Sequence, residues 1–207
     1  IDTEIRAGMI SSIVAGAKFG LGRDPLRTLL LLSVMLGGSF SVMQISMPRV
    51  VEDVYGRDAG VAGVVLGAFG IGMLISSVAV SRRRAMRHGW NITLFIGIGL
   101  GLGQFALSFA ANEWVAMLVM LAWGLNAGIA MASHRTLMQT NTPPEMMGRV
   151  MGLYTLVQAG LLPIGALLLG LIASQIGTGN AISGAAAVGL SVVVTTYVRN
   201  TELRRLG

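Results

Sequence analysis

The sequence predicts an all-α membrane protein with six transmembrane helices. The first observation is composition: hydrophobic residues make up 54% of the 207 positions and charged residues only 12%, about half the charged share of an average soluble domain. The mean hydropathy of +0.74 excludes a disordered chain. The second observation is a series of long uncharged runs, and the third is the uneven placement of Lys and Arg between them.

Five uncharged runs are long enough to cross a bilayer. A helix rises about 1.5 Å per residue and needs about 20 apolar residues to cross roughly 30 Å of hydrocarbon. Four runs of 20 to 25 residues provide one crossing each, and a run of 49 residues provides two, with a turn at 177–180. The predicted spans, each bounded by charged residues or by that turn, are residues 27–48, 59–80, 90–110, 113–133, 150–172 and 181–198.

The chain divides around these spans into a leading segment of residues 1–25, a bundle of residues 26–199 and a tail of residues 200–207. In the leading segment, Ile5, Met9, Ile13 and Ala17 recur at a spacing of four. This spacing predicts a short amphipathic helix that lies in the cytoplasmic interface and links into the bundle.

Lys and Arg fall on one set of alternate connections. Thirteen of the fifteen lie before the first span, after the second, after the fourth and in the tail. Because Lys and Arg stay on the cytoplasmic side, both termini are predicted to be cytoplasmic. The richest connection holds Arg82, Arg83 and Arg84, which we interpret either as a topology anchor on anionic headgroups or as part of a cytoplasmic gate. A nucleic-acid partner is excluded because no aromatic residues alternate with these arginines.

Glycine makes up 29 residues, and small residues allow close helix packing in lipid. The clearest patterns are Gly63-x-x-x-Gly67 followed by Gly70 and Gly72, the glycines at 97, 99, 101 and 103, and those at 160, 165 and 170. Pro163 lies inside the fifth span, frees a backbone carbonyl and predicts a hinge there.

No Asp, Glu, Lys or Arg lies deep in any predicted span, so the polar candidates are neutral. Gln44, Asn126 and Gln158 either line a wet cavity or form structural bonds between helices. Trp123 and Tyr154 either add aromatic lining or simply pack. His88 and His134 lie at the cytoplasmic edge, far apart in sequence, and do not suggest a metal pair. The chain has no Cys and no catalytic triad or carboxylate pair, so we expect no enzyme activity, metal or cofactor.

Three stretches resemble one transporter family. They are residues 23–30 (RDPLRTLL), residues 47–72 with Met47, Pro48 and Gly72 at their ends, and residues 142–154 (TPPEMMGRVMGLY) followed by Pro163 and Gly170. Together they resemble the carboxyl-terminal half of a major facilitator superfamily transporter, of the drug and siderophore exporter branch that includes enterobactin-exporter-like transmembrane secretion effectors.

The resemblance implies a bundle of 3+3 inverted repeats in a bacterial inner membrane, with the first, second, fourth and fifth spans facing a central cavity. That placement favours Gln44, Trp123, Asn126, Tyr154 and Gln158 as cavity residues. The family's cytoplasmic charge motif has an acidic residue near the place of Ser81, so a gate there rests on Arg82, Arg83 and Arg84 alone. Arg149 is either a second gate residue or an anchor whose side chain extends to the interface.

Two classes of function follow. The first is half of a proton-coupled exporter, or antiporter, of small amphipathic molecules, whose partners are the lipid bilayer and an amino-terminal six-helix half that carries the coupling carboxylates. The second is a non-transporting structural subunit that scaffolds a larger membrane complex. A half-size transporter that acts as a homodimer is a third possibility.

Overall fold

The computed structural model describes residues 2–81, 99 and 103–199, and no β-strand occurs within these ranges. Its helices are α1 (Asp2–Leu21), α2 (Asp24–Asp53), α3 (Ala59–Ser81), α5 (Gln104–Ser108), α6 (Glu113–Thr140), α7 (Pro144–Ile176) and α8 (Thr178–Arg199). Four described helices are long and apolar enough to cross a membrane, within Leu26–Asp53, Ala59–Val80, Glu113–Thr140 and Pro144–Ile176. Most of the predicted span 90–110 lies outside the described residues, so the count of six stays a prediction.

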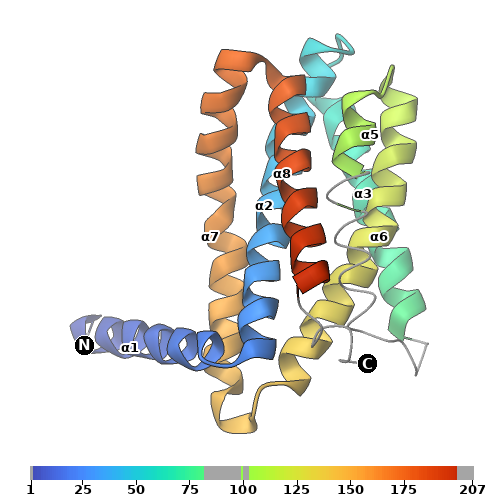
Figure 1. The fold of residues 1–207 in the computed structure, drawn as a ribbon. Coiled ribbons are helices and arrows are strands. Elements are labelled where there is room, and N and C mark those ends of the chain that lie inside the picture. The colour runs from blue at the N-terminus through green and yellow to red at the C-terminus, as the bar shows by residue number, and fades with distance from the viewer. Residues whose placement is uncertain (1, 82–98, 100–102, 200–207) are drawn as a thin grey trace.

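The long helices run side by side: α2 and α7 run in one direction, and α3, α6 and α8 run in the opposite direction (Figure 1). α1 lies across one end of the bundle, next to the turn between α6 and α7 (Figure 1). We call this the α1 end. The connections from α2 to α3, from α5 to α6 and from α7 to α8 lie at the opposite end (Figure 1).

Several helix boundaries differ from the predicted spans. α2 continues through Pro48 to Asp53, and α6 continues through His134 to Thr140, because a helix need not stop where charge first appears. Asn112 caps α6, since its side-chain oxygen accepts a hydrogen bond of 3.0 Å from the amide of Val115. The predicted turn at 177–180 is a single residue, Gly177, whose φ of 85° is accessible to glycine.

α1 is helical as predicted, but the face it buries is shifted by one residue. Gly16 and Gly20 are buried, whereas Ile13 and Ala17 are only half-buried. A Cβ built on Gly16 would lie 2.8 Å from the carbonyl oxygen of Arg149 in α7. The glycines therefore let α1 approach the first turns of α7 closely.

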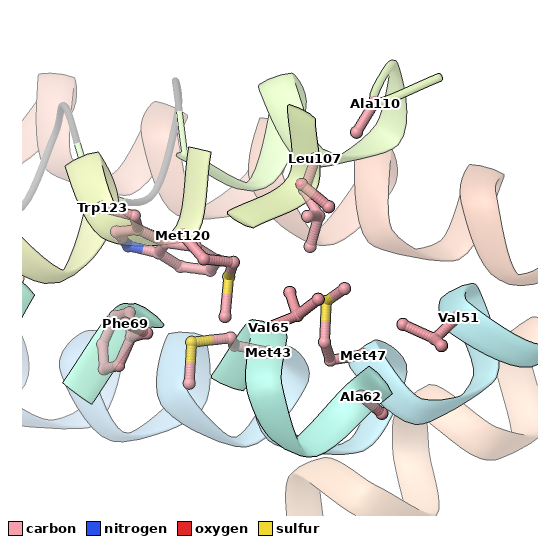
Figure 2. Packing of buried hydrophobic residues seen from close by; sticks show 11 residues of the cluster. Met43, Met47, Val51, Ala62, Val65, Phe69, Leu107, Ala110, Met120 and Trp123 are labelled. Carbon is pink, nitrogen blue, oxygen red and sulfur yellow. The ribbon is translucent and has the colours of Figure 1, made fainter. Parts of the chain in front are cut away.

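Two apolar clusters hold the bundle together. The first lies at the α1 end between α2, α6 and α7 and includes Leu29, Met138, Val150 and Tyr154. The second joins α2, α3, α5 and α6, and Figure 2 shows the side chains of Met43, Met47 and Met120 meeting near its centre. The unbranched thioether side chains of methionine fit irregular spaces between helices.

Several of the predicted glycines pack closely against a neighbouring helix: a Cβ built on Gly72 of α3 would meet the backbone of Leu121 in α6, and Cβ atoms on Gly99 and Gly103 would meet Trp123. Among the described residues, nothing lies within 4 Å of a Cβ built on Gly63 or Gly67, so this pair makes no close helix contact there. The crossing of α3 and α6 also depends on Gly124, which meets the carbonyl of Phe69, and on Gly128, which meets Ser76. Of the three predicted glycines in α7, Gly165 packs against Ser41, while Gly160 and Gly170 face open space in the described structure.

Candidate functional site

A buried polar cluster lies near the α1 end, where α2, α6 and α7 meet. Its members are Ser33, His134, Tyr154 and Gln158, and we call them the polar cluster. The Nε2 atom of His134 is 2.8 Å from the carbonyl oxygen of Leu29 and 3.2 Å from Oγ of Ser33. The imidazole stacks on the ring of Tyr154, with centroids 5.4 Å apart. His134 thus joins all three helices.

Gln158 extends this cluster along α7 toward the middle of the bundle. Its Nε2 donates a hydrogen bond of 3.1 Å to the hydroxyl oxygen of Tyr154. A Cβ built on Gly37 of α2 would lie 2.9 Å from Oε1 of Gln158. Glycine at position 37 therefore leaves room for the amide between α2 and α7. The predicted cavity residues Tyr154 and Gln158 are direct neighbours.

Trp123 and Asn126 form a separate pair on α6. Trp123 packs edge-on against Phe69 of α3, with centroids 5.9 Å apart. A Cβ built on Gly99 would lie 2.8 Å from Oδ1 of Asn126 and 3.2 Å from Nε1 of Trp123. These two predicted cavity residues therefore face α3 and Gly99 rather than the polar cluster.

Two further candidates lie on the exposed surface of this bundle. Gln44 is exposed on α2 and belongs to neither group. Pro48, four residues further along α2, has no N–H. The backbone carbonyl of Gln44 therefore lacks its usual helical hydrogen-bond donor. Pro163 is also exposed, and α7 remains a continuous helix through it.

Of the four basic candidates, Arg149 lies among the described residues, at the α1 end. Arg82, Arg83 and Arg84 fall outside the described residues. Arg149 is exposed on the second turn of α7, and its Nη1 is 3.7 Å from the sulfur of Met146. Its backbone carbonyl is the atom that Gly16 of α1 approaches. Arg149 thus marks the contact between α1 and the bundle.

An ion pair at the opposite end joins the connection between α2 and α3 to the start of α6. Nη2 of Arg57 is 2.7 Å from Oε1 of Glu113, and Nε of Arg57 donates to the same oxygen at 3.0 Å. Nearby, the hydroxyl of Tyr55 donates a hydrogen bond of 3.1 Å to the carbonyl of Ala110. Partial burial, assisted by the Glu113 carboxylate, raises the pKa of Tyr55 above its ordinary value.

Sequence reasoning missed both His134 and the pair of Arg57 with Glu113. His134 is completely buried between α2, α6 and α7 near the α1 end. The available signal was its place directly after a hydrophobic stretch, with Leu137 and Met138 one helical turn further on. Arg57 and Glu113 are 56 positions apart, and only the fold brings them together.

Comparisons with known proteins agree with this helical architecture. A family model described as transmembrane secretion effector matches residues 2–205. The enterobactin exporter EntS of Escherichia coli O127:H6 is 28% identical over 200 residues, which cover 95% of this chain and 47% of the relative. The enterobactin exporter EntS of Shigella flexneri is 28% identical over 203 residues, covering 95% and 46%. No solved structure matches the chain.

The chain spans about half the length of these curated relatives. The family model, by contrast, matches it almost from end to end, and the apolar helices of the fold are those of a membrane transport protein. The chain therefore belongs to the transmembrane secretion effector family of the major facilitator superfamily.

Proposed function

We propose that the chain forms the carboxyl-terminal half of a secondary active exporter of small amphipathic molecules. The observation that carries the proposal is the family match along residues 2–205 in a chain about half as long as its exporter relatives. In such transporters one bundle rocks against another around a site near the bilayer midplane, giving alternating access. The partner is an amino-terminal six-helix half, which carries the carboxylates that bind the coupling proton.

The chemistry of the buried side chains supports an amphipathic substrate. Such a substrate carries no fixed charge that this half of the transporter would have to neutralise. Among the described residues, the buried polar side chains are hydroxyls, the amide of Asn126 and the imidazole of His134. Such groups donate and accept hydrogen bonds but offer no permanent counter-charge. Aromatic surface comes from Trp123 and Tyr154, which are also buried.

We assign substrate contact to Gln44, Trp123, Asn126, Tyr154 and Gln158, exposed in turn as the two halves rock. A second group of residues controls access from the cytoplasmic side, and Pro163 is the hinge in α7. That second group comprises Arg82, Arg83, Arg84 and Arg149. The 3+3 inverted repeat and the inner-membrane orientation, with both termini cytoplasmic, belong to the same proposal.

Efflux by the native full-length protein in proteoliposomes, driven by an imposed pH gradient, tests the proposal. With the amphipathic dye Hoechst 33342 as the probe, we expect Asn126→Leu and Gln158→Leu each to reduce efflux by about fivefold, the equivalent of one lost hydrogen bond of about 1 kcal/mol. Gln139→Leu is the matched control, because Gln139 is exposed at the α1 end of α6.

Unchanged size-exclusion profiles would separate a transport defect from a folding defect. Loss of the folded protein in Asn126→Leu and Gln158→Leu would support purely structural bonds between helices. A native protein that moves no probe and co-purifies with unrelated subunits would support the scaffold function instead.

A further inference from the structure

His134 is a buried titratable group whose surroundings satisfy only one of its two ring nitrogens. The residue is completely buried. Nε2 has the Leu29 carbonyl at 2.8 Å, while Nδ1 has no hydrogen-bond partner among the described residues. The neighbouring Ser133 hydroxyl is also buried and unpartnered within the described structure. Most buried polar atoms in proteins have a partner, so such an atom calls for an explanation.

The hydrogen bonds around Nε2 define which nitrogen carries the proton. The hydroxyl of Ser33 donates to the Leu29 carbonyl at 2.9 Å, so its hydrogen is already used. A carbonyl oxygen can only accept, and therefore Nε2 of His134 must be the donor to Leu29. In the neutral ring Nδ1 then holds a lone pair, which is where a second proton would bind.

Among the residues that the structure describes, the charged ring has no acceptor for that second proton in this packing. The titratable group that faces it is the phenol of Tyr154 on α7, which lies against the face of the imidazole. On the α2 side, the imidazole of His134 lies against the Leu29 carbonyl and the Ser33 hydroxyl. The charged side chains at the α1 ends of these helices are all exposed; they are Asp24 and Arg27 of α2, Arg135 of α6, and Glu145 and Arg149 of α7. The packed arrangement therefore fits the neutral ring only.

We propose that His134 is a proton-binding site that links protonation to the separation of α2, α6 and α7 at the α1 end. Neutral His134 joins α6 to α2 through the Leu29 carbonyl and to α7 through Tyr154. Protonation at Nδ1 creates a buried donor, which favours an arrangement in which water reaches the ring. The inference is independent of which solute, if any, the protein moves.

A single cysteine on the same side of α6 tests this linkage in the native full-length protein. The chain has no Cys of its own, so Leu137→Cys, one turn from His134 and buried, reports separation at the α1 end when any cysteine elsewhere in the protein is replaced. Its rate of labelling by a membrane-impermeant maleimide is divided by that of Gln139→Cys, an exposed site. The ratio cancels the pH dependence of thiolate formation.

We expect this ratio to rise by about threefold or more between about pH 8 and about pH 5.5. His134→Gln keeps an amide donor for Leu29 but cannot bind a proton, so its ratio should not change with pH. His88→Gln, at the other histidine of the chain, should behave like the native protein. A rise that persists in His134→Gln, or one that disappears in His88→Gln, would overturn the proposal.

A second measurement uses native His134 and so does not depend on whether the variant folds. In protein with ¹⁵N-labelled histidine rings, the His134 signals should show the Nε2–H tautomer at about pH 8 and imidazolium at about pH 5.5. The conversion should follow the change in labelling ratio. A ring that stays neutral while the ratio rises, or one that titrates without any change in the ratio, would refute the linkage.

Discussion

Single side chains make the hydrogen bonds that join the helices at each end of the bundle. At the α1 end His134 reaches the Leu29 carbonyl, and at the opposite end Tyr55 reaches the Ala110 carbonyl. Neither partner is a side chain. Sequence patterns identify side-chain types, but they do not show which backbone carbonyl a distant helix presents. The residues alone therefore did not reveal either contact.

Tyr55 gives a pH-dependent prediction. Its folded pKa lies above the ordinary value because burial and the Glu113 carboxylate disfavour the phenolate. The neutral phenol therefore stabilises the fold at pH below about 10, and this contribution is lost as the pH rises through the folded pKa. We expect Tyr55→Phe to lower stability by about 1 kcal/mol at neutral pH and to remove this loss above about pH 10.

An ultraviolet titration of the protein in detergent checks the predicted pH dependence of Tyr55. The difference spectrum between the native protein and Tyr55→Phe should show tyrosinate forming only above about pH 10. Tyrosinate that forms at the pH typical of an unperturbed tyrosine would contradict the contact with Ala110. So would an equal loss of stability at alkaline pH in the native protein and in Tyr55→Phe.

At the scale of helices, charge and hydropathy located the described spans well but their ends poorly. α3 matches the predicted 59–80 closely, at Ala59–Ser81. α6 and α7 are longer than predicted because caps and backbone hydrogen bonds end helices, not the first charged residue. Glycine spacing predicted close packing but not the partner, since the face that a helix presents to its neighbour depends on how the two cross.

Gly124 and Gly67 form a matched pair for testing helix packing. Gly124→Ala would place a Cβ against the Phe69 backbone, so α3 and α6 must move apart, and we expect a destabilisation of about 1–3 kcal/mol. Gly67→Ala meets open space among the described residues and should be neutral or stabilising, because alanine favours helix by about 1 kcal/mol. Thermal unfolding in detergent measures both, and equal midpoints would show that the α3–α6 crossing does not need glycine.

At the scale of the whole molecule, the connections divide between two ends, as the distribution of Lys and Arg suggested. α1 and the turn between α6 and α7 share one end (Figure 1). The connections from α2 to α3 and from α7 to α8 lie at the other (Figure 1). The direction in which this bundle sits in a membrane follows from the positive-inside rule and stays a prediction.

Moving three arginines tests that orientation. If Arg82, Arg83 and Arg84 hold their connection in the cytoplasm, transferring them to the connection before Glu113 should disturb insertion. Cysteines added at Gly56 and at Asn141, which lie at opposite ends of the bundle, would then change their accessibility to an impermeant maleimide. Replacing the three by lysine in place is the control and should change nothing. Unchanged accessibility after the transfer would contradict the role of these arginines in topology.

Composition and charge spacing alone determined that the chain is helical and lipid-embedded, because the cost of burying charge in hydrocarbon acts on each residue separately. The resemblance of residues 23–30, 47–72 and 142–154 indicated the transporter family that the comparisons show. Tertiary structure alone decided that Tyr154 and Gln158 meet His134, while Trp123 and Asn126 face α3 and Gly99. The physical reason is that the way two helices cross and the glycines at their contact determine which side chains meet, and these are properties of pairs of helices rather than of one sequence window.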